Sequence, residues 1–152
     1  MKLATLCYLR RDGHTLMLHR TKKPGDYHQG KWNGLGGKLR PGESPEECLH
    51  REVLEESGLT VEAATLRGLI TFPNFDGIDD WYCFIYTVEQ TSGQLSESPE
   101  GELRWIPDRE LLSLNLWEGD RVFIPWLFQD KLFSAKFIYE QGEFKSYQVT
   151  FY

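Results

Sequence analysis

The stretch GGKLRPGESPEECLHREVLEESGL, residues 36–59, gives the strongest fold signal in the chain and raises a question about its charge. Within it, Glu52, Glu55 and Glu56 fall inside five residues, and no lysine follows to pair with them. Like charges three and four residues apart on a helix repel each other and destabilise it slightly. Some other group must therefore offset this repulsion.

The same stretch carries the start and stop signals of a helix over residues 45–57. Ser44 stands at the N-cap, Pro45 at the first helical position, and Glu47 completes an S-x-x-E capping box. Gly58 is suited to end the helix in the left-handed conformation. At about 100° per residue, the three glutamates would share roughly one third of the helix circumference. We therefore expect a short helix with one acidic side.

Most of the remaining sequence predicts β-strands. LATLCYL (3–9) and LMLHR (16–20), separated by an Asp-Gly turn, indicate a β-hairpin, and a polar loop follows over 21–30. KWNGLGGKL (31–39) is so rich in glycine that we expect something to approach its backbone closely. The other predicted elements are strands at 66–72, 81–88 and 102–106, a helical turn at 108–112, a helix at 118–129 kinked or started by Pro125, and a closing hairpin over 135–152 that turns near Gln141-Gly142.

Length and composition indicate one globular domain, residues 1–152, of mixed α+β class. The chain is 40% hydrophobic and 14% aromatic, which is enough for a packed core. Its 17 basic and 23 acidic residues give a net charge of −6. That balance argues against a nucleic acid polymer as partner, because such a partner needs a basic face. A small phosphorylated molecule held through a metal remains compatible with it.

The cysteines and the apolar runs indicate the compartment. Cys7, Cys48 and Cys83 are scattered and form no C-x-x-C or Cys/His ligand pattern, which is typical of reduced packing residues. The first apolar run is too short for a signal peptide, and none is long enough to span a membrane. We expect a soluble, cytoplasmic protein without a membrane partner, and a monomer by default.

Two explanations fit the acidic side of the predicted helix. A solvated acidic face is common on surface helices, and three glutamates alone would favour that explanation. Alternatively, a divalent cation binds there, because hard cations take oxygen ligands and often join carboxylates to substrate phosphates. A cation would explain both why the carboxylates converge and what offsets their repulsion.

The residues before the glutamates favour the cation. Residues 36–59 follow the pattern G-x5-E-x7-R-E-U-x-E-E-x-G-U, where U is aliphatic, and average residue usage would produce it on the order of once in 10^9 windows. The pattern resembles the Nudix box without a mismatch, and the resemblance covers nearly the whole chain. It implies a Nudix fold, a mixed β-sheet sandwiched between α-helices. The matched positions are Gly37, Glu43, Arg51, Glu52, Val53, Glu55, Glu56, Gly58 and Leu59.

The resemblance also implies a set of catalytic and metal-binding residues. It implies Mg²⁺ as the cofactor, with Mn²⁺ as a substitute, because such a cation neutralises phosphate oxygens and lowers the pKa of bound water. The general base would be Glu52 or a carboxylate from a later loop. The implied roles are metal ligation by Glu52 and Glu56 with Glu55 beside them, a contribution from the Gly36 carbonyl, and an ion pair between Glu43 and Arg51. Glu100 would act as a ligand or as the base, a role for which Glu97 and Glu102 are close enough in sequence to compete. Lys23 and Lys38 are candidate phosphate contacts, although surface lysine is the simpler explanation for both.

Three further segments resemble the oxidised-purine nucleoside triphosphatases of this family, the MutT-related 8-oxo-dGTP diphosphatases. They are KWNGLGGK (31–38), ITFP (70–73) and LWEGDRVFIPWL (116–127). The resemblance implies a base pocket in which a carboxylate accepts from the guanine edge, an amide reads the oxidised edge and an indole stacks on the purine. Its residues would be Asn33, Trp117 and Asp120, with Phe72, Tyr27 and Trp81 as walls. Most also have a structural alternative: a turn residue for Asn33, a core residue for Trp117, a helix N-terminal acid for Asp120, and a framework or rim position for Tyr27 and Trp81.

One departure from the subgroup concerns the pocket. The mammalian-type pattern has two adjacent aspartates after this tryptophan, whereas here the pair is Gly119-Asp120. Tyr8 also replaces a small polar residue. The expected reaction is hydrolysis of 8-oxo-dGTP or a related nucleotide to the monophosphate and pyrophosphate, for nucleotide-pool sanitation and DNA repair, with oxidised adenine in doubt. The alternatives are another Nudix substrate, such as a general dNTP, a nucleotide sugar or a dinucleoside polyphosphate, and last a module that binds nucleotides without cleaving them.

Overall fold

The computed structural model describes residues 1–22 and 24–152, so the predicted phosphate contact Lys23 lies outside the described residues. The strands are β1 (Lys2–Arg11), β2 (His14–Arg20), β3 (Trp32–Asn33), β4 (Leu35–Lys38), β5 (Thr60–Phe72), β6 (Trp81–Ser92), β7 (Gly101–Pro107), β8 (Phe133–Glu140) and β9 (Glu143–Phe151). The helices are α1 (Pro45–Ser57) and α2 (Glu118–Phe123), with 3₁₀ segments η1 (Asp108–Ser113) and η2 (Ile124–Phe128). No helix in these ranges is long and apolar enough to cross a membrane.

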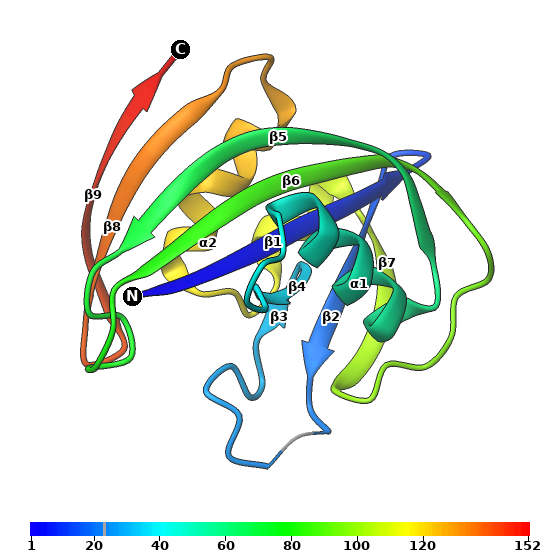
Figure 1. Cartoon of the computed structure of the whole chain (residues 1–152), viewed down its shortest axis with the longest axis horizontal. Coiled ribbons are helices and arrows are strands. Elements are labelled where there is room, and N and C mark those ends of the chain that lie inside the picture. Colours follow the sequence, from blue (N-terminus) through cyan, green and yellow to red (C-terminus); the bar gives the residue numbers. More distant parts are fainter. Residues whose placement is uncertain (23) are drawn as a thin grey trace.

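The strands form one mixed sheet, as predicted. Its order is β3-β2-β1-β6-β5-β8-β9, with β4 also paired to β1 and β7 to β2. β1 runs parallel to β6 and antiparallel to β2 and β4, while β5 runs antiparallel to β6 and parallel to β8. The long strands β5 and β6 sweep across the molecule, with α1 on one side and α2 on the other (Figure 1).

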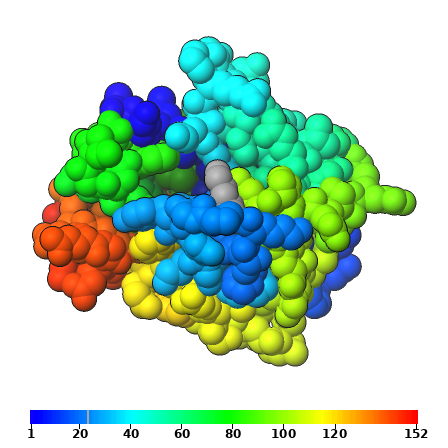
Figure 2. Space-filling model, turned by 90° about the horizontal axis from the view of Figure 1, so that it is seen from below, coloured from blue at the N-terminus to red at the C-terminus, as the bar shows by residue number. Residues whose placement is uncertain are grey.

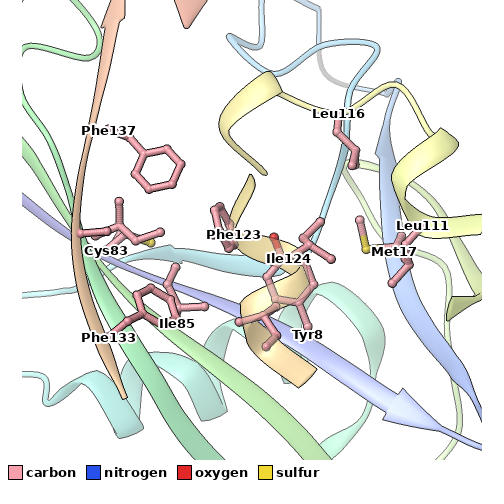
Figure 3. Close-up of a cluster of buried hydrophobic side chains, with 14 of the residues drawn as sticks. Tyr8, Met17, Cys83, Ile85, Leu111, Leu116, Phe123, Ile124, Phe133 and Phe137 are labelled. Atoms are coloured by element: carbon pink, nitrogen blue, oxygen red, sulfur yellow. The ribbon is translucent and has the colours of Figure 1, made fainter. Parts of the chain in front are cut away.

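Two hydrophobic clusters fill the two faces of this sheet. Alternate residues of β1 point to opposite sides, so Cys7 and Leu9 join Leu49 and Val53 of α1 in one cluster. Tyr8 points the other way, into a cluster that contains residues of α2, η2 and β8. Figure 3 shows this second cluster, with Phe123 between Tyr8 and Phe137. The α-β-α layering predicted from the sequence is therefore the one observed.

The predicted helix over 45–57 is confirmed together with its caps. The Ser44 hydroxyl accepts from the Glu47 N–H at 3.1 Å, and a Glu47 carboxylate oxygen accepts from the Ser44 N–H at 2.9 Å. Gly58 ends the helix with φ of 77°. The capping box and the terminal glycine thus fix the length of the helix that carries the three glutamates.

We expect Ser44→Ala to lower the free energy of unfolding by about 1 kcal/mol, because the Glu47 N–H loses its acceptor at the helix N-terminus. Urea denaturation monitored by circular dichroism measures the difference. Ser146→Ala, on an exposed position of β9, is the matched control and should change the free energy by less than about 0.5 kcal/mol. Equal changes in the two variants would contradict the capping role.

Several predicted boundaries were wrong, for physical reasons. β5 begins at Thr60 and β6 runs to Ser92, so both strands are longer than predicted. The added residues are mostly exposed, and bulges interrupt their pairing, so they lack a clear alternating pattern. The predicted helix over 118–129 is α2 followed by the 3₁₀ segment η2, because Pro125 has no N–H to continue an α-helix. The closing hairpin is present, with Gln141 and Gly142 both at positive φ.

Candidate functional site

A cavity of about 890 Å³ lies at the end of the sheet beside α1 and β4, and it contains most of the predicted site residues. It opens next to the loop over 24–30, which is drawn in blue in Figure 2, with the segment after β4 in cyan above it. The predicted residues that line it are Tyr27, Asn33, Gly36, Lys38, Arg51, Glu52, Glu55, Phe72, Trp81, Glu100, Trp117 and Asp120. Glu43 and Glu56 do not line it but contact residues that do.

Arg51 is the central cation of the acidic half of the cavity. Its Nε and Nη2 atoms donate to the two carboxylate oxygens of Glu43, at 2.7 and 2.9 Å, and Nη2 also donates to the Lys38 carbonyl at 3.1 Å. Its Nη1 donates to Glu52 at 2.6 Å and lies 3.5 Å from Glu55. This bidentate pair with Glu43 joins the loop after β4 to α1.

Two arginines, Arg51 and Arg40, offset the charges of Glu52 and Glu55. Besides Arg51, Arg40 lies 3.7 Å from Glu55, and Arg20 of β2 lies 3.3 Å from Glu100. Neither of these two residues was predicted to belong to the site. Their only signal in the sequence was a positive charge at the end of a predicted strand or loop.

Of the three glutamates Glu52, Glu55 and Glu56, Glu56 is the one that no arginine contacts among the described residues. Its side chain is 3% exposed, and one carboxylate oxygen accepts from the Gly36 N–H at 3.0 Å. The other oxygen, Oε2, is buried and has no hydrogen-bond partner in the described part of the chain. Burial, followed by the negative charge of Glu100, raises the pKa of Glu56 above its usual value.

The residues around Glu56 fit a divalent cation. A buried carboxylate oxygen without a partner, close to Glu52 and Glu100, is the environment that a hard cation satisfies. As placed, however, no three His, Cys, Asp or Glu side chains within residues 1–22 and 24–152 form a group that could hold a metal. Glu52 points to Arg51 and Glu100 to Arg20, so both carboxylates would have to turn to share an ion with Glu56.

The glycine-rich turn brings the loop close to the glutamates. A Cβ atom on Gly37 would lie only 2.6 Å from the Glu52 carboxylate, so a larger residue would push Glu52 away. The N–H of the neighbouring Gly36 is already bonded to Glu56. The close backbone approach predicted for this segment is made by the carboxylates of α1 at Gly36 and Gly37 and by the backbone of β1 at Gly34 and Gly36.

The other half of the cavity is aromatic. Trp117 stacks on Tyr27 at 5.5 Å and 14°, and meets Phe75 and Tyr139 edge to face. Tyr27 is 51% exposed and stands at the rim, where its hydroxyl donates to the Phe75 carbonyl at 3.3 Å. Phe72 contacts Phe75 and Tyr139 from β5. These rings line the same half of the cavity, which we call the aromatic slot.

The orientation of Trp117 depends on a residue that the sequence did not single out. The Trp117 indole N–H donates to His28 Nδ1 at 2.8 Å. Burial lowers the pKa of His28 to about 4, so its ring is neutral near pH 7 and Nδ1 can accept. His28, Phe75 and Tyr139 were all missed, because single aromatic residues in a loop or strand carry no local signal of a shared pocket.

Two polar groups lie among these rings. Asp120 is 7% exposed, and its burial raises the pKa of its carboxyl to about 7, against the opposing positive charges of Lys31 and Arg121. Asn33 is 8% exposed, and its Nδ2 atom has no hydrogen-bond partner among the described residues. Two buried polar side chains with unused bonding capacity are typical of a binding pocket.

Trp81 serves the framework more than the slot. Its indole N–H donates to Asp76 at 3.0 Å, and the same aspartate accepts from the N–H groups of Ile78 and Asp79. Lys38 Nζ lies 5.9 Å from the Trp81 ring centroid, at the border between the acidic and aromatic halves. Trp81 therefore fixes the 73–80 loop beside the cavity.

Comparison with known proteins identifies this arrangement. Residues 1–127 match the NUDIX domain. The chain belongs to the Nudix family. A zebrafish (Danio rerio) protein named oxidized purine nucleoside triphosphate hydrolase is 33% identical over 139 residues, which cover 91% of this chain and 87% of the relative. The mouse (Mus musculus) protein of the same name is 33% identical over 122 residues, with 80% and 78% covered.

A solved Nudix-type structure agrees with the fold. A MutT protein from Bacillus halodurans has a TM-score of 0.87 with this chain at 30% identity, and the match covers 98% of this chain and 97% of the other. The predicted resemblance to MutT-related Nudix proteins is confirmed. This chain is a Nudix hydrolase, an enzyme that acts on a phosphoric anhydride in a small nucleotide.

Proposed function

We propose that this Nudix hydrolase converts an oxidised purine nucleoside triphosphate, preferentially 8-oxo-dGTP, to the monophosphate and pyrophosphate with Mg²⁺ as cofactor. The observation that carries the proposal is one cavity with the carboxylates Glu52, Glu55 and Glu100 in one half and the buried pair Asn33 and Asp120 beside aromatic rings in the other. The names of the zebrafish and mouse relatives support the same substrate class.

The aromatic half suits an oxidised purine base. Trp117 offers a flat face for stacking. The ionised Asp120 carboxylate can accept two hydrogen bonds from the ring N–H and the amino group of a guanine edge. The free Nδ2 of Asn33 can donate to the oxygen that oxidation adds to the base, and its Oδ1 can accept from the adjacent ring N–H. An unmodified guanine has a bare N7 acceptor in place of this N–H, so Asn33 Oδ1 would face a lone pair and lose its donor.

The acidic half suits the triphosphate. The residues that would hold the cation are Glu52 and Glu56, with Glu55, Glu100 and the Gly36 carbonyl. When bound, Mg²⁺ would neutralise phosphate oxygens and lower the pKa of the attacking water. Glu52 or Glu100 would accept a proton from that water, while Lys38 would meet a phosphate oxygen. Arg51, held by Glu43, would keep the loop and α1 in register, and Mn²⁺ would replace Mg²⁺.

The cellular role that follows is sanitation of the nucleotide pool, which prevents damaged bases from entering DNA. For this role we propose a cytoplasmic monomer in which residues 1–152 act as one Nudix domain, with no nucleic acid polymer as partner. The single acid at Gly119-Asp120 leaves one carboxylate to read the base. Oxidised adenine should therefore be a poorer substrate than oxidised guanine.

The test is product analysis with Mg²⁺ over a small panel: 8-oxo-dGTP, dGTP, oxidised dATP, ADP-ribose and a dinucleoside polyphosphate. We expect pyrophosphate as product and a kcat/KM for 8-oxo-dGTP at least about tenfold above that for dGTP, since a polar site discriminates strongly against a base that leaves it unpaired. Faster hydrolysis of ADP-ribose or of the dinucleoside polyphosphate than of 8-oxo-dGTP would show that the enzyme has another Nudix substrate. No turnover by a folded protein would favour a nucleotide-binding module.

A further inference from the structure

The β8–β9 hairpin lies beyond residues 1–127, the part that matches the NUDIX domain, yet one of its side chains reaches the cavity. Tyr139 of β8 is 5% exposed. Its ring packs edge to face against Trp117, at 5.7 Å between centroids, and against Phe75 at 5.2 Å. The hairpin therefore supplies a wall of the aromatic slot.

The Tyr139 hydroxyl makes a second kind of contact. It accepts a hydrogen bond from the Gly119 N–H at 2.7 Å, and Gly119 lies in the first turn of α2. The N–H groups of a first helical turn have no partner within the helix and need a cap. Over the described residues, α2 has no side-chain hydrogen bond from its own N-cap residue, Trp117. Tyr139, on a distant strand, thus accepts the hydrogen bond of an N–H group that a local capping residue would otherwise satisfy.

The packing at Gly119 is matched to this contact. A Cβ atom at Gly119 would lie 2.6 Å from the Tyr139 Oη and 2.7 Å from Phe137 Cδ2. Gly119 is not among the glycines with positive φ, so its backbone does not require glycine. The need is steric, because the first turn of α2 sits directly on the hairpin. Gly119 stands where the mammalian-type pattern has the first of its two aspartates. Its lack of a side chain leaves the space that Tyr139 occupies.

We propose that Tyr139 is a positioning residue for base recognition, whose hydroxyl holds Gly119 and so fixes where the adjacent Asp120 carboxylate stands in the pocket. This inference rests on the proposed role of Asp120. The C-terminal hairpin, and not only the matched domain, then determines how this enzyme reads a base. The ring and the hydroxyl of Tyr139 have separate roles: the ring walls the slot and the hydroxyl orients α2.

Tyr139→Phe separates these two roles because it keeps the ring and removes the acceptor. We expect the KM for 8-oxo-dGTP to rise about three- to tenfold, the range for loss of one neutral hydrogen bond, while kcat stays within about twofold. The kinetics with dCTP, whose base lacks the guanine donor pair, should not change. Tyr147→Phe is the matched control, since Tyr147 lies on β9, 46% exposed and packed on Trp126 outside the cavity.

A double-mutant cycle tests the contact itself. Gly119→Ala should impair 8-oxo-dGTP hydrolysis in the parent enzyme and impair it less in the Tyr139→Phe background, where the Oη overlap is gone and only that with Phe137 remains. Losses that simply multiply would overturn the coupling. An unchanged KM in Tyr139→Phe, or equal changes in its kinetics with 8-oxo-dGTP and dCTP, would overturn the positioning role.

Asp120→Asn distinguishes this inference from the proposed function. If Asp120→Asn raises KM for the best nucleotide of the panel but Tyr139→Phe does not, the inference is wrong and the pocket assignment stands. If neither variant raises KM, the base-reading role of Asp120 is wrong, and the inference is overturned with it. If both raise KM for a nucleotide other than 8-oxo-dGTP, the positioning role holds and only the proposed substrate fails.

Discussion

Replacing Glu56 with glutamine is expected to lower Mg²⁺-dependent kcat by about a thousandfold or more. Glu56 Oε2 is buried without a partner in the described structure, and the proposed cation would use that oxygen. Charge stabilisation by a bound cation is worth several kcal/mol in such reactions, and about 1.4 kcal/mol corresponds to a factor of ten. The measurement is pyrophosphate release from 8-oxo-dGTP with Mg²⁺ titrated to saturation, so that weaker metal binding and slower chemistry can be told apart.

Glutamine at position 56 should leave the fold intact. Its side-chain oxygen has the same reach and can still accept from the Gly36 N–H, which Glu56 now does at 3.0 Å. Circular dichroism and the thermal midpoint check this point. Glu62→Gln, the same change on β5 where the side chain accepts from Ser92, is the matched control and should keep parent activity. Full Mg²⁺-dependent activity in Glu56→Gln would remove Glu56 from the metal site.

The helix that carries Glu56 was predictable because its determinants are local. Ser44, Glu47 and Gly58 specify both ends of α1 through hydrogen bonds that span only a few residues. The helical period then puts the glutamates on one side whatever the rest of the chain does. The spacing of the glutamates along the chain is therefore enough to place them near one another. The prediction that they bind a cation, by contrast, needed the family resemblance to outweigh a solvated acidic face.

The base pocket was only partly predictable, because its geometry comes from contacts between distant parts of the chain. Asn33, Trp117 and Asp120 were named from short matched segments, and they do line one cavity. The partners that orient them were not found. The bond from Trp117 to His28 joins residues 89 apart in sequence, and that from Gly119 to Tyr139 joins residues 20 apart.

The C-terminal hairpin shows most clearly which structural features a sequence pattern cannot predict. Phe133, Ala135, Phe137 and Tyr139 are buried at every second position of β8, and this period predicts a strand with one buried face. The alternation shows which side of β8 is buried but not which element packs against that side. Only the parallel pairing of β8 with β5 brings that face over α2 and the cavity. A strand and its orientation can be predicted locally, whereas a hydroxyl that caps a helix cannot.

Asp120→Asn is expected to lower kcat/KM for 8-oxo-dGTP by about a hundredfold or more, with little effect on dCTP. An ionised carboxylate can accept both hydrogen bonds of a guanine edge, and bonds to a charged group contribute about 1.5–3 kcal/mol each. Asparagine offers one acceptor and turns its amide donors toward the second donor of the base. Glu118→Gln, in the same helical turn and 65% exposed, is the matched control and should behave as the parent enzyme.

The pH dependence of the parent enzyme should report the same group. Burial raises the pKa of Asp120 to about 7, and the ionised form is the one that accepts from the base. The kcat/KM for 8-oxo-dGTP, which reflects the free enzyme, should therefore fall as pH decreases through about 7. In Asp120→Asn this step should be absent, while any step that belongs to the metal-binding glutamates should remain. A step of the same size in both enzymes would show that a group other than Asp120 titrates near pH 7.

The stability of the same variant should change in the opposite direction to its activity. Because the folded-state pKa of Asp120 lies above the unfolded value of about 3.9, the ionised carboxylate destabilises the fold, with a cost that grows as pH rises from about 4 to about 7. Asp120→Asn should therefore unfold at a higher temperature than the parent at pH values above 7, and the difference should vanish near pH 4. Lower activity together with higher stability is expected if the Asp120 carboxylate binds the base and destabilises the fold. If Asp120 only capped α2, its replacement would instead make the protein less stable. Lower stability of Asp120→Asn at alkaline pH, with 8-oxo-dGTP hydrolysis unchanged, would show that Asp120 supports the helix and does not read the base.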